Sequence, residues 1–296
     1  MLKTLRLNGQ SNIKDGCVML LGGFDGLHAG HKTLVERAKA YALPIGAMTI
    51  VGGKGGESLF TEEERIEMFS SAKVDFLFQL PFAEIKDYSP EAFASLLEER
   101  FSPKAFVCGD DFRFGKMAAG TPQTLKQTTQ VPVEIVALLQ KNGEKISSTT
   151  VKACLSKGEI MMANELLGER FFLIGEVIKD RGVGKTLGFP TANILYPKGK
   201  FPLKKGVYET QAVFEGKTYK GITNYGARPT FDNDTVLTET YFDGFSGDLY
   251  GKKIKLEFTR FMREIKKFDS VEELKRQLKS DLAEVRNRDK VWTERK

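Results

Sequence analysis

The sequence predicts two domains: a doubly wound, mostly parallel α/β domain, then a small, mostly antiparallel β-barrel with a closing helix. Up to about residue 168, apolar strand-like runs alternate with helical patterns, which is typical of a parallel sheet covered by helices. Beyond Gly168 the strand-like runs follow one another directly, which indicates a barrel. The 296 residues are enough for two ordinary domains. We therefore expect one domain in residues 1–168 and a second in residues 169–296.

The first domain is expected to be Rossmann-like, with buried strands at residues 17–21, 45–51, 76–80, 105–108 and 131–138. A helix is expected over residues 33–42. Thr61 and Glu64 form a capping box that starts the next helix. Further helices start at Ser89, where a proline follows the capping serine, and at Thr121. Ligands of such a sheet collect at the carboxyl ends of its strands.

The second domain is expected to contain successive strands at residues 171–178, 206–214, 217–224, 236–242 and 252–261. Two short helices precede them in residues 149–167, with a break at Gly158 and a stop at Gly168. Glu215-Gly216 is the tight turn of a hairpin. An amphipathic helix over residues 271–286 is expected to close the barrel.

Composition indicates a soluble cytoplasmic protein. Hydrophobic residues make up 41% and charged residues 28% of the chain, and no apolar run reaches the length of a membrane span. The N-terminal residues lack the apolar core of a signal peptide. Cys17, Cys108 and Cys154 are widely spaced, which indicates reduced thiols and excludes a disulfide framework or a zinc site.

The charge of the chain is unevenly distributed. Residues 1–168 hold 19 Lys and Arg against 20 Asp and Glu, whereas residues 169–296 hold 26 against 19. A basic C-terminal half suits phosphorylated ligands or nucleic acid. A solvated lysine-rich surface is the alternative explanation.

The stretch LLGGFDGLHAGHKTL, residues 20–34, carries the main chemical signal. It runs from a strand through a glycine-rich turn into a helix, and it holds both histidines of the chain, His28 and His31. A helix N-terminus offers free N–H groups to phosphate, while Gly22, Gly23 and Gly30 allow close approach of a ligand. Asp25 is expected to cap the turn or to orient a partner. The alternatives are a helix start with solvent-facing histidines and a metal pair, for which a third ligand is missing.

Two further segments follow expected strands. In GDDFRFG, residues 109–115, charged Asp111 and Arg113 alternate with two phenylalanines, which suits a planar ring with a polar edge. The alternative is a hairpin tip packed on the core. In ISSTTVK, residues 146–152, hydroxyl groups open a helix and Lys152 follows one turn later, where it can meet a phosphate. A plain helix cap is the alternative there.

The second half contains LGFPTAN (residues 187–193), NYGARPTF (224–231), DLYG (248–251) and FMREIKKF (261–268). The preceding RGVGKT is not a P-loop, because Lys179 stands where the first glycine is required and no helix pattern follows. Glu239 lies nine residues before DLYG. A carboxylate there can accept a proton from a substrate hydroxyl, although most glutamates on strands are simply exposed.

These motifs, in this order over essentially the whole chain, resemble the bacterial bifunctional riboflavin kinase/FAD synthetase family. The resemblance implies FMN adenylyltransferase activity in residues 1–168 and riboflavin kinase activity in residues 169–296, with ATP as co-substrate, Mg²⁺ as cofactor, and riboflavin, FMN and FAD as substrates or products. Small molecules are the expected partners, with no nucleic acid or membrane and with a monomer or weak homo-oligomer.

The resemblance also implies roles for residues that match the family motifs. Catalytic roles are implied for His28, His31, Lys152 and Glu239. Nucleotide or phosphate binding is implied for Gly22, Gly23, Phe24, Asp25, Gly30, Asp111, Arg113, Ser147, Ser148, Thr149 and Gly188. Flavin binding is implied for Phe112, Phe114, Asn224, Arg228 and Arg263, and binding of the Mg²⁺-nucleotide for Thr191 and Asn193.

The sequence departs from the family pattern at several positions. The stretch VGGKGGES (residues 51–58) replaces an F-x-P-H-P-type loop, and Lys152 replaces an arginine. Residues 183–185 replace R-G-R, Tyr241 replaces a histidine, and Asp243-Gly244 replaces L-D. The departures at residues 183–185 and 241–244 keep one alternative open: an FMN adenylyltransferase with a flavin-binding or regulatory C-terminal domain. The basic C-terminal half keeps a second open: a nucleic-acid-binding or regulatory protein with flavin as its ligand.

Overall fold

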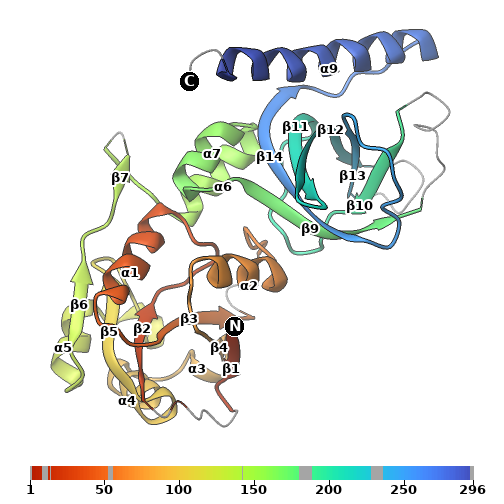
Figure 1. Cartoon of the computed structure of the whole chain (residues 1–296). Coiled ribbons are helices and arrows are strands. Elements are labelled where there is room, and N and C mark those ends of the chain that lie inside the picture. The colour runs from red at the N-terminus through yellow and green to blue at the C-terminus, as the bar shows by residue number, and fades with distance from the viewer. Residues whose placement is uncertain are drawn as a thin grey trace. The chain divides into compact units, whose positions relative to one another are not determined.

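The computed structural model divides into two compact units, residues 1–150 and 151–296 (Figure 1). It describes residues 2–8, 13, 15–52, 56–141, 143–179, 189–227 and 236–293. The division comes after Thr150, whereas the pattern of the sequence changes at Gly168. The helices α6 (Ser148–Lys157) and α7 (Ile160–Leu167) therefore lie almost entirely in the second unit.

The first unit contains a six-stranded parallel sheet of order β1-β4-β3-β2-β5-β6, which confirms the expected α/β fold. Its strands are β1 (Lys3–Arg6), β2 (Cys17–Leu21), β3 (Ile45–Val51), β4 (Phe76–Pro81), β5 (Pro103–Gly109) and β6 (Val133–Val136). Its helices are α1 (Ala29–Lys39), α2 (Glu62–Ser71), α3 (Phe82–Ile85), α4 (Pro90–Phe101) and α5 (Pro122–Thr128). A small hairpin, β7 (Gln140–Lys141) with β8 (Glu144–Lys145), follows β6.

The strand order places the candidate segments together. The chain leaves β2 for β3 and β4 on one side of it, and returns to β5 and β6 on its other side. The histidine turn follows β2, the GDDFRFG loop follows β5, and β7, β8 and the serine-rich turn follow β6. Because these strands are adjacent and parallel, all three segments leave from one edge of the sheet, where ligands of such sheets bind.

The core of the first unit is built from alternate residues of the strands. Met19, Leu21 and Phe106 pack with Phe93 and Leu97 of α4 in one buried cluster. This alternation explains why a continuous apolar run such as CVMLL forms a strand: both of its faces are covered. The helix α1 contacts β2, β3 and β5.

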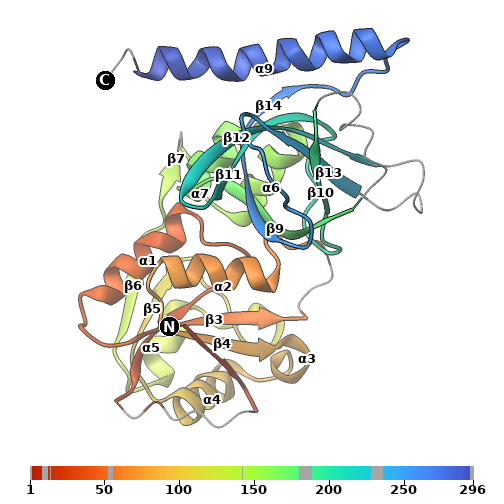
Figure 2. The same ribbon diagram turned by 45° about the vertical axis from the view of Figure 1, so that its right-hand side comes forward.

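The second unit contains a closed antiparallel barrel of order β10-β13-β12-β11-β14-β9, visible in Figure 2. Its strands are β9 (Phe171–Ile178), β10 (Thr191–Leu195), β11 (Gly206–Phe214), β12 (Lys217–Ala227), β13 (Val236–Phe242) and β14 (Lys253–Arg263). The barrel expected from the sequence is confirmed, and β10 is a strand that the sequence analysis missed. The turn Glu215-Gly216 has φ angles of 51° and 77°, as a tight hairpin requires.

The closing helix α9 (Val271–Thr293) packs on the outside of the barrel, as expected. Leu282 and Val285 of this helix form a buried cluster with Val207 and Ile222. In the chain segments that the structure describes, no helix is both long enough and apolar enough to cross a membrane.

Candidate functional site

The helix α1 starts at Ala29, four residues earlier than expected, because His28 caps it. The His28 ring nitrogen Nδ1 accepts a hydrogen bond of 3.3 Å from the His31 backbone N–H. Histidine is not a usual N-cap residue, so the sequence pattern did not reveal this cap. A Cβ on Gly30 would lie 3.2 Å from the His28 ring, so the glycine keeps room for that ring.

The two histidines of the turn lie against each other. Their rings are stacked with centroids 3.6 Å apart and planes inclined by 17°. His31 Nδ1 lies 2.8 Å from the Gly26 carbonyl oxygen, and its ring packs on Phe24 at 4.5 Å. His28 is buried, and His31 is partly buried. The pair is therefore held in one orientation by backbone groups and an aromatic ring.

Burial keeps both imidazoles neutral. Loss of solvent lowers the pKa of His28 to about 4, with a further contribution from the positive charge of Lys145. Burial, the neighbouring His28 and the Lys145 charge lower the pKa of His31 to about 3. At neutral pH the turn therefore presents two uncharged rings at a helix N-terminus.

The other predicted residues of the turn have mixed surroundings. Asp25 Oδ1 accepts a hydrogen bond from the Leu59 N–H at 2.9 Å, which ties the turn to the segment before α2. Phe24 is 1% exposed and packs on Phe69, so it anchors the turn to the protein core. Gly23 is exposed, and a Cβ there would meet nothing within 4 Å, so it is open to a ligand.

The GDDFRFG loop divides into buried and exposed residues. Phe112 and Phe114 are 8% and 6% exposed, stack on each other at 5.4 Å and belong to the core cluster. This burial favours the packing role that the sequence left open. Asp111 and Arg113 are exposed, and Asp111 forms an ion pair with Lys145.

Lys145 is a residue that the sequence analysis did not select. It ends β8 and acts electrostatically on both histidines. The carbonyl oxygen of the next residue, Ile146, lies 3.9 Å from the position of a Cβ on Gly30. In the sequence, this lysine is marked only by its place two residues before the paired serines. That position alone does not show that it lies near the histidines.

The serine-rich turn is a reciprocal cap at the start of α6. The Ser147 N–H donates to Thr150 Oγ1 at 3.0 Å, and the Thr150 N–H donates to Ser147 Oγ at 3.2 Å. Ser148 and Thr149 lie in the first turn of α6. The Lys152 ammonium, on the same helix beyond the division between the units, lies 5.6 Å from the centre of the Phe201 ring.

In the barrel, the predicted kinase residues lie opposite one another on neighbouring strands. Asn193 of β10 and Asn224 of β12 are both register partners of Glu239 on β13. Thr191 is the partner of Tyr241, two residues further along the same strands. Because directly opposed residues share a face and the face repeats every second residue, all five side chains belong to one face of the barrel wall.

Asn193 is the most constrained member of this face. It is 4% exposed, and its Oδ1 has no hydrogen-bond partner among the residues that the structure describes. A buried carbonyl oxygen without a partner is costly, which indicates a ligand. Amide and hydroxyl oxygens suit Mg²⁺, so Asn193 and Thr191 fit the expected Mg²⁺-nucleotide.

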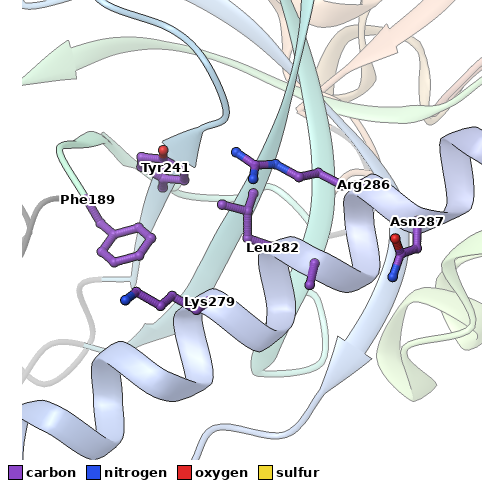
Figure 3. A pocket seen from close by; sticks show the side chains of 7 residues that line it. Phe189, Tyr241, Lys279, Leu282, Arg286 and Asn287 are labelled. Atoms are coloured by element: carbon purple, nitrogen blue, oxygen red, sulfur yellow. The ribbon is translucent and has the colours of Figure 1, made fainter.

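A cavity of about 570 Å³ lies between this wall and α9 (Figure 3). Phe189 and Tyr241 form its aromatic side, with ring centroids 5.1 Å apart in an edge-to-face arrangement. Leu282, Lys279 and Arg286 line it from α9. Tyr241, which replaces the family's histidine, therefore supplies an aromatic wall.

Ion pairs hold α9 over the cavity. Arg263 binds the buried Asp281 through Nε and Nη2, with a shortest distance of 2.7 Å. Arg286 binds Asp243 through two hydrogen bonds of 2.7 and 2.6 Å. Arg263 thus anchors the helix, and the Asp243-Gly244 departure supplies a partner for α9. Gly188, Arg228 and residues 183–185 lie outside the described residues.

Comparison with known proteins identifies both halves. A family model described as FAD synthetase matches residues 10–150, and one described as riboflavin kinase matches residues 167–288. The Bacillus subtilis bifunctional riboflavin kinase/FMN adenylyltransferase is 31% identical over 90% of this chain and 91% of its own length. The Buchnera aphidicola (Schizaphis graminum) protein of the same name is 31% identical over 96% and 98%.

A solved structure extends the likeness to the whole fold. The crystal structure of a Streptococcus pneumoniae protein described as a macrolide-efflux protein matches with a TM-score of 0.87 at 28% identity. The match covers 96% of this chain and 99% of that one. The two family models and the relatives show that the chain belongs to the family of bifunctional riboflavin kinase/FMN adenylyltransferases.

Proposed function

We propose that the chain makes FAD in two steps, phosphorylating riboflavin to FMN with ATP and then transferring AMP from a second ATP to FMN. The observation that carries this proposal is the presence of both family domains in one chain, each with its own cluster of candidate residues. The match of the riboflavin kinase model favours two activities over an adenylyltransferase with a non-catalytic second domain.

In the adenylyl transfer step, an FMN phosphate oxygen attacks the α-phosphorus of ATP. A new P–O bond forms, the bond from the α-phosphorus to the bridging oxygen breaks, and pyrophosphate leaves. His28, His31 and the N–H groups at the start of α1 stabilise the charge on the phosphate oxygens. The turn of Ser147, Ser148 and Thr149 holds the leaving pyrophosphate, and Lys152 is proposed to assist.

In the kinase step, the Glu239 carboxylate accepts the proton of the riboflavin 5′-hydroxyl as that oxygen attacks the γ-phosphorus of ATP. A new P–O bond forms, the bond from the γ-phosphorus to the bridging oxygen breaks, and ADP leaves. Asn193 and Thr191 would hold the Mg²⁺-nucleotide next to Glu239 on the barrel wall. When bound, Mg²⁺ neutralises phosphate charge. The register of Asn193 and Asn224 on either side of Glu239 supports this arrangement.

The cavity between the barrel wall and α9 is proposed to bind the isoalloxazine ring of riboflavin. Its volume of about 570 Å³ is within the range of small-molecule sites, and its walls combine aromatic and aliphatic side chains with two cations. Phe189 and Tyr241 pack edge to face, so they form an angled aromatic wall against which a planar ring can pack. Asn224 is proposed to contact the flavin from the wall.

A product assay tests the proposal. The full-length protein is incubated with ATP and Mg²⁺, and with either riboflavin or FMN, and flavins are separated by chromatography. FAD from both substrates is the expected result. Formation of FAD from FMN but not from riboflavin would rule out the kinase activity. Formation of FAD from neither substrate would rule out both activities. Cytoplasmic location, a monomer or weak homo-oligomer, and absence of nucleic-acid and membrane partners stay predictions.

A further inference from the structure

The two histidines of the turn have different hydrogen-bond partners, and this distinguishes their chemistry. The neighbour of His31 Nδ1 is the Gly26 carbonyl oxygen, at 2.8 Å. A carbonyl oxygen only accepts, so Nδ1 of His31 must carry hydrogen. In the neutral ring, His31 Nε2 therefore carries a lone pair and no hydrogen, so it cannot donate a hydrogen bond to a phosphate.

The partner of His28 has the opposite polarity. His28 Nδ1 faces the backbone N–H of His31 at 3.3 Å, and an N–H only donates. His28 Nδ1 therefore carries the lone pair, and in the neutral ring the hydrogen is on Nε2. His28 can donate to a phosphate oxygen without any change of protonation.

The stacked geometry also decides where an additional proton goes. The ring centroids are 3.6 Å apart, so two positive rings would repel strongly, and the pair accepts one proton at most. Protonation of His28 would place hydrogen on Nδ1 against the His31 N–H and destroy the helix cap. Protonation of His31 adds hydrogen at Nε2 and keeps the bond to Gly26. Burial and neighbouring charge lower the pKa of His31 further than that of His28, but only His31 can take the proton without losing a hydrogen bond. We therefore assign the additional proton to His31.

Burial is the main reason why His31 is neutral before a ligand binds, and the charges around the pair add to it. Among the described residues, the charged group from a neighbouring element that acts on both rings is the Lys145 ammonium from β8. The carboxylate of Asp111 pairs with Lys145, and Asp25 on the turn itself accepts from Leu59. A polyphosphate bound at this helix N-terminus would supply several negative charges and reverse the local field.

We infer that His28 is a permanent hydrogen-bond donor, whereas His31 takes one proton from solvent when the triphosphate of ATP binds and then donates from Nε2. This inference rests on the proposed adenylyl transfer site. The structure thus divides one motif into two functions: a fixed neutral donor and a group that becomes cationic with its substrate. ATP affinity should then rise by up to about tenfold per pH unit as the pH falls toward the pKa of His31 in the free protein.

Nuclear magnetic resonance of the full-length protein tests the assignment directly. The chain has two histidines, so a ¹⁵N-histidine-labelled sample gives two side-chain patterns, both from this turn. Without ATP, one ring should show hydrogen on Nε2 and the other on Nδ1. With Mg-ATP at neutral pH, the ring with hydrogen on Nδ1 should gain hydrogen on Nε2, which requires its pKa to rise from about 3 by about four units. Equal tautomers in the free protein would overturn the inference.

Calorimetry in buffers of different ionisation enthalpy measures the proton itself. Wild-type protein should take up as much as one proton on binding Mg-ATP, as should His28→Asn, which keeps a capping side chain. His31→Gln should bind ATP more weakly and take up none. Lys39→Gln, at an exposed position of α1, is the matched control and should behave as wild type. Uptake lost in His28→Asn but kept in His31→Gln would reverse the assignment and overturn the inference.

The outcomes separate this inference from the proposed function. If Mg-ATP binds and FAD is formed while His31 stays neutral, the inference fails alone. If Mg-ATP leaves both histidine signals unchanged and no FAD is formed from FMN, the proposed adenylyl transfer site and the inference fall together. Lys145→Gln offers a further check, because loss of its charge should raise the pKa of both histidines in the free protein.

Discussion

The two candidate sites of this chain are built in contrasting ways. The adenylyl transfer site starts from one continuous turn, in which His28 caps the helix that His31 belongs to. The kinase site is assembled from three strands, since Asn193, Glu239 and Asn224 come from β10, β13 and β12. The first depends on local backbone geometry and the second on strand register. A motif can therefore reveal the first completely, whereas the second exists only in the closed barrel.

The sites also differ in how they carry charge. The histidine turn is neutral in the free protein, because burial lowers the pKa of both rings. The barrel site places the Glu239 carboxylate beside a buried amide with an unsatisfied oxygen. The histidine turn is therefore suited to bind a negatively charged group, whereas the barrel site is suited to accept a proton and to bind a cation. Variants that separate the two activities therefore test the comparison.

The largest expected effect is from the double variant His28→Ala/His31→Ala. Each ring supplies one donor to developing phosphate charge, so their joint loss should slow FAD formation from FMN by about 10⁴-fold. Removal of the cap should also destabilise α1 by roughly 1 kcal/mol. Conversion of riboflavin to FMN by the same sample, measured by chromatography, is the internal control and should persist. FAD synthesis at the wild-type rate would refute the role of the turn.

The converse variant is Glu239→Gln. The amide cannot accept the hydroxyl proton, so conversion of riboflavin to FMN should fall by about 10³-fold while FAD formation from FMN is unchanged. Initial rates with each flavin measure both steps. Glu176→Gln, at an exposed position of β9, is the matched control and should leave both rates unaltered. Equal loss of the two activities would indicate that the sites are not independent.

Asp281→Asn tests whether ion pairs hold α9 over the cavity. Removal of the charge leaves the Arg263 guanidinium without its buried partner, which should destabilise the second unit by about 3 kcal/mol. Denaturant unfolding followed by circular dichroism measures this change. Arg276→Gln, at an exposed position of α9, is the matched control. An unchanged unfolding midpoint for Asp281→Asn would show that the helix is held by its apolar contacts alone.

The smallest expected effect is from Asp243→Asn. Hydrogen bonding to Arg286 lowers the pKa of the Asp243 carboxyl below its ordinary value of 3.8. A carboxyl group with a lowered pKa stabilises the folded state at pH values above its ordinary pKa. That stabilisation is lost as the pH falls through the pKa of the folded state. The variant should therefore be slightly less stable than wild type at neutral pH, and the difference should disappear in acid. A constant difference at all pH values would exclude this ion pair as its cause. Urea titrations at several pH values measure it.

Much of the fold followed from local patterns. The strands β2 to β5 are mostly apolar and mostly buried, because both faces of a parallel sheet are covered. The strand β1, with sequence KTLR, was missed because it is mostly exposed and pairs on one side with β4. The strand β10 was missed because five residues after a proline carry little signal. Its pairing with β13 and β9 makes it a strand.

By itself, the sequence determined the α/β and barrel classes, the histidine turn and the family motifs, because these depend on periodicity and on neighbours within a few residues. Only the tertiary structure decided that Phe112 and Phe114 are buried, that Arg263 anchors α9, and that Lys145 acts on the histidines. Those properties depend on which distant segment lies within a few ångströms. The partners that decide the tautomers, Gly26 and the His31 N–H, are close in sequence, but only the folded turn orients them.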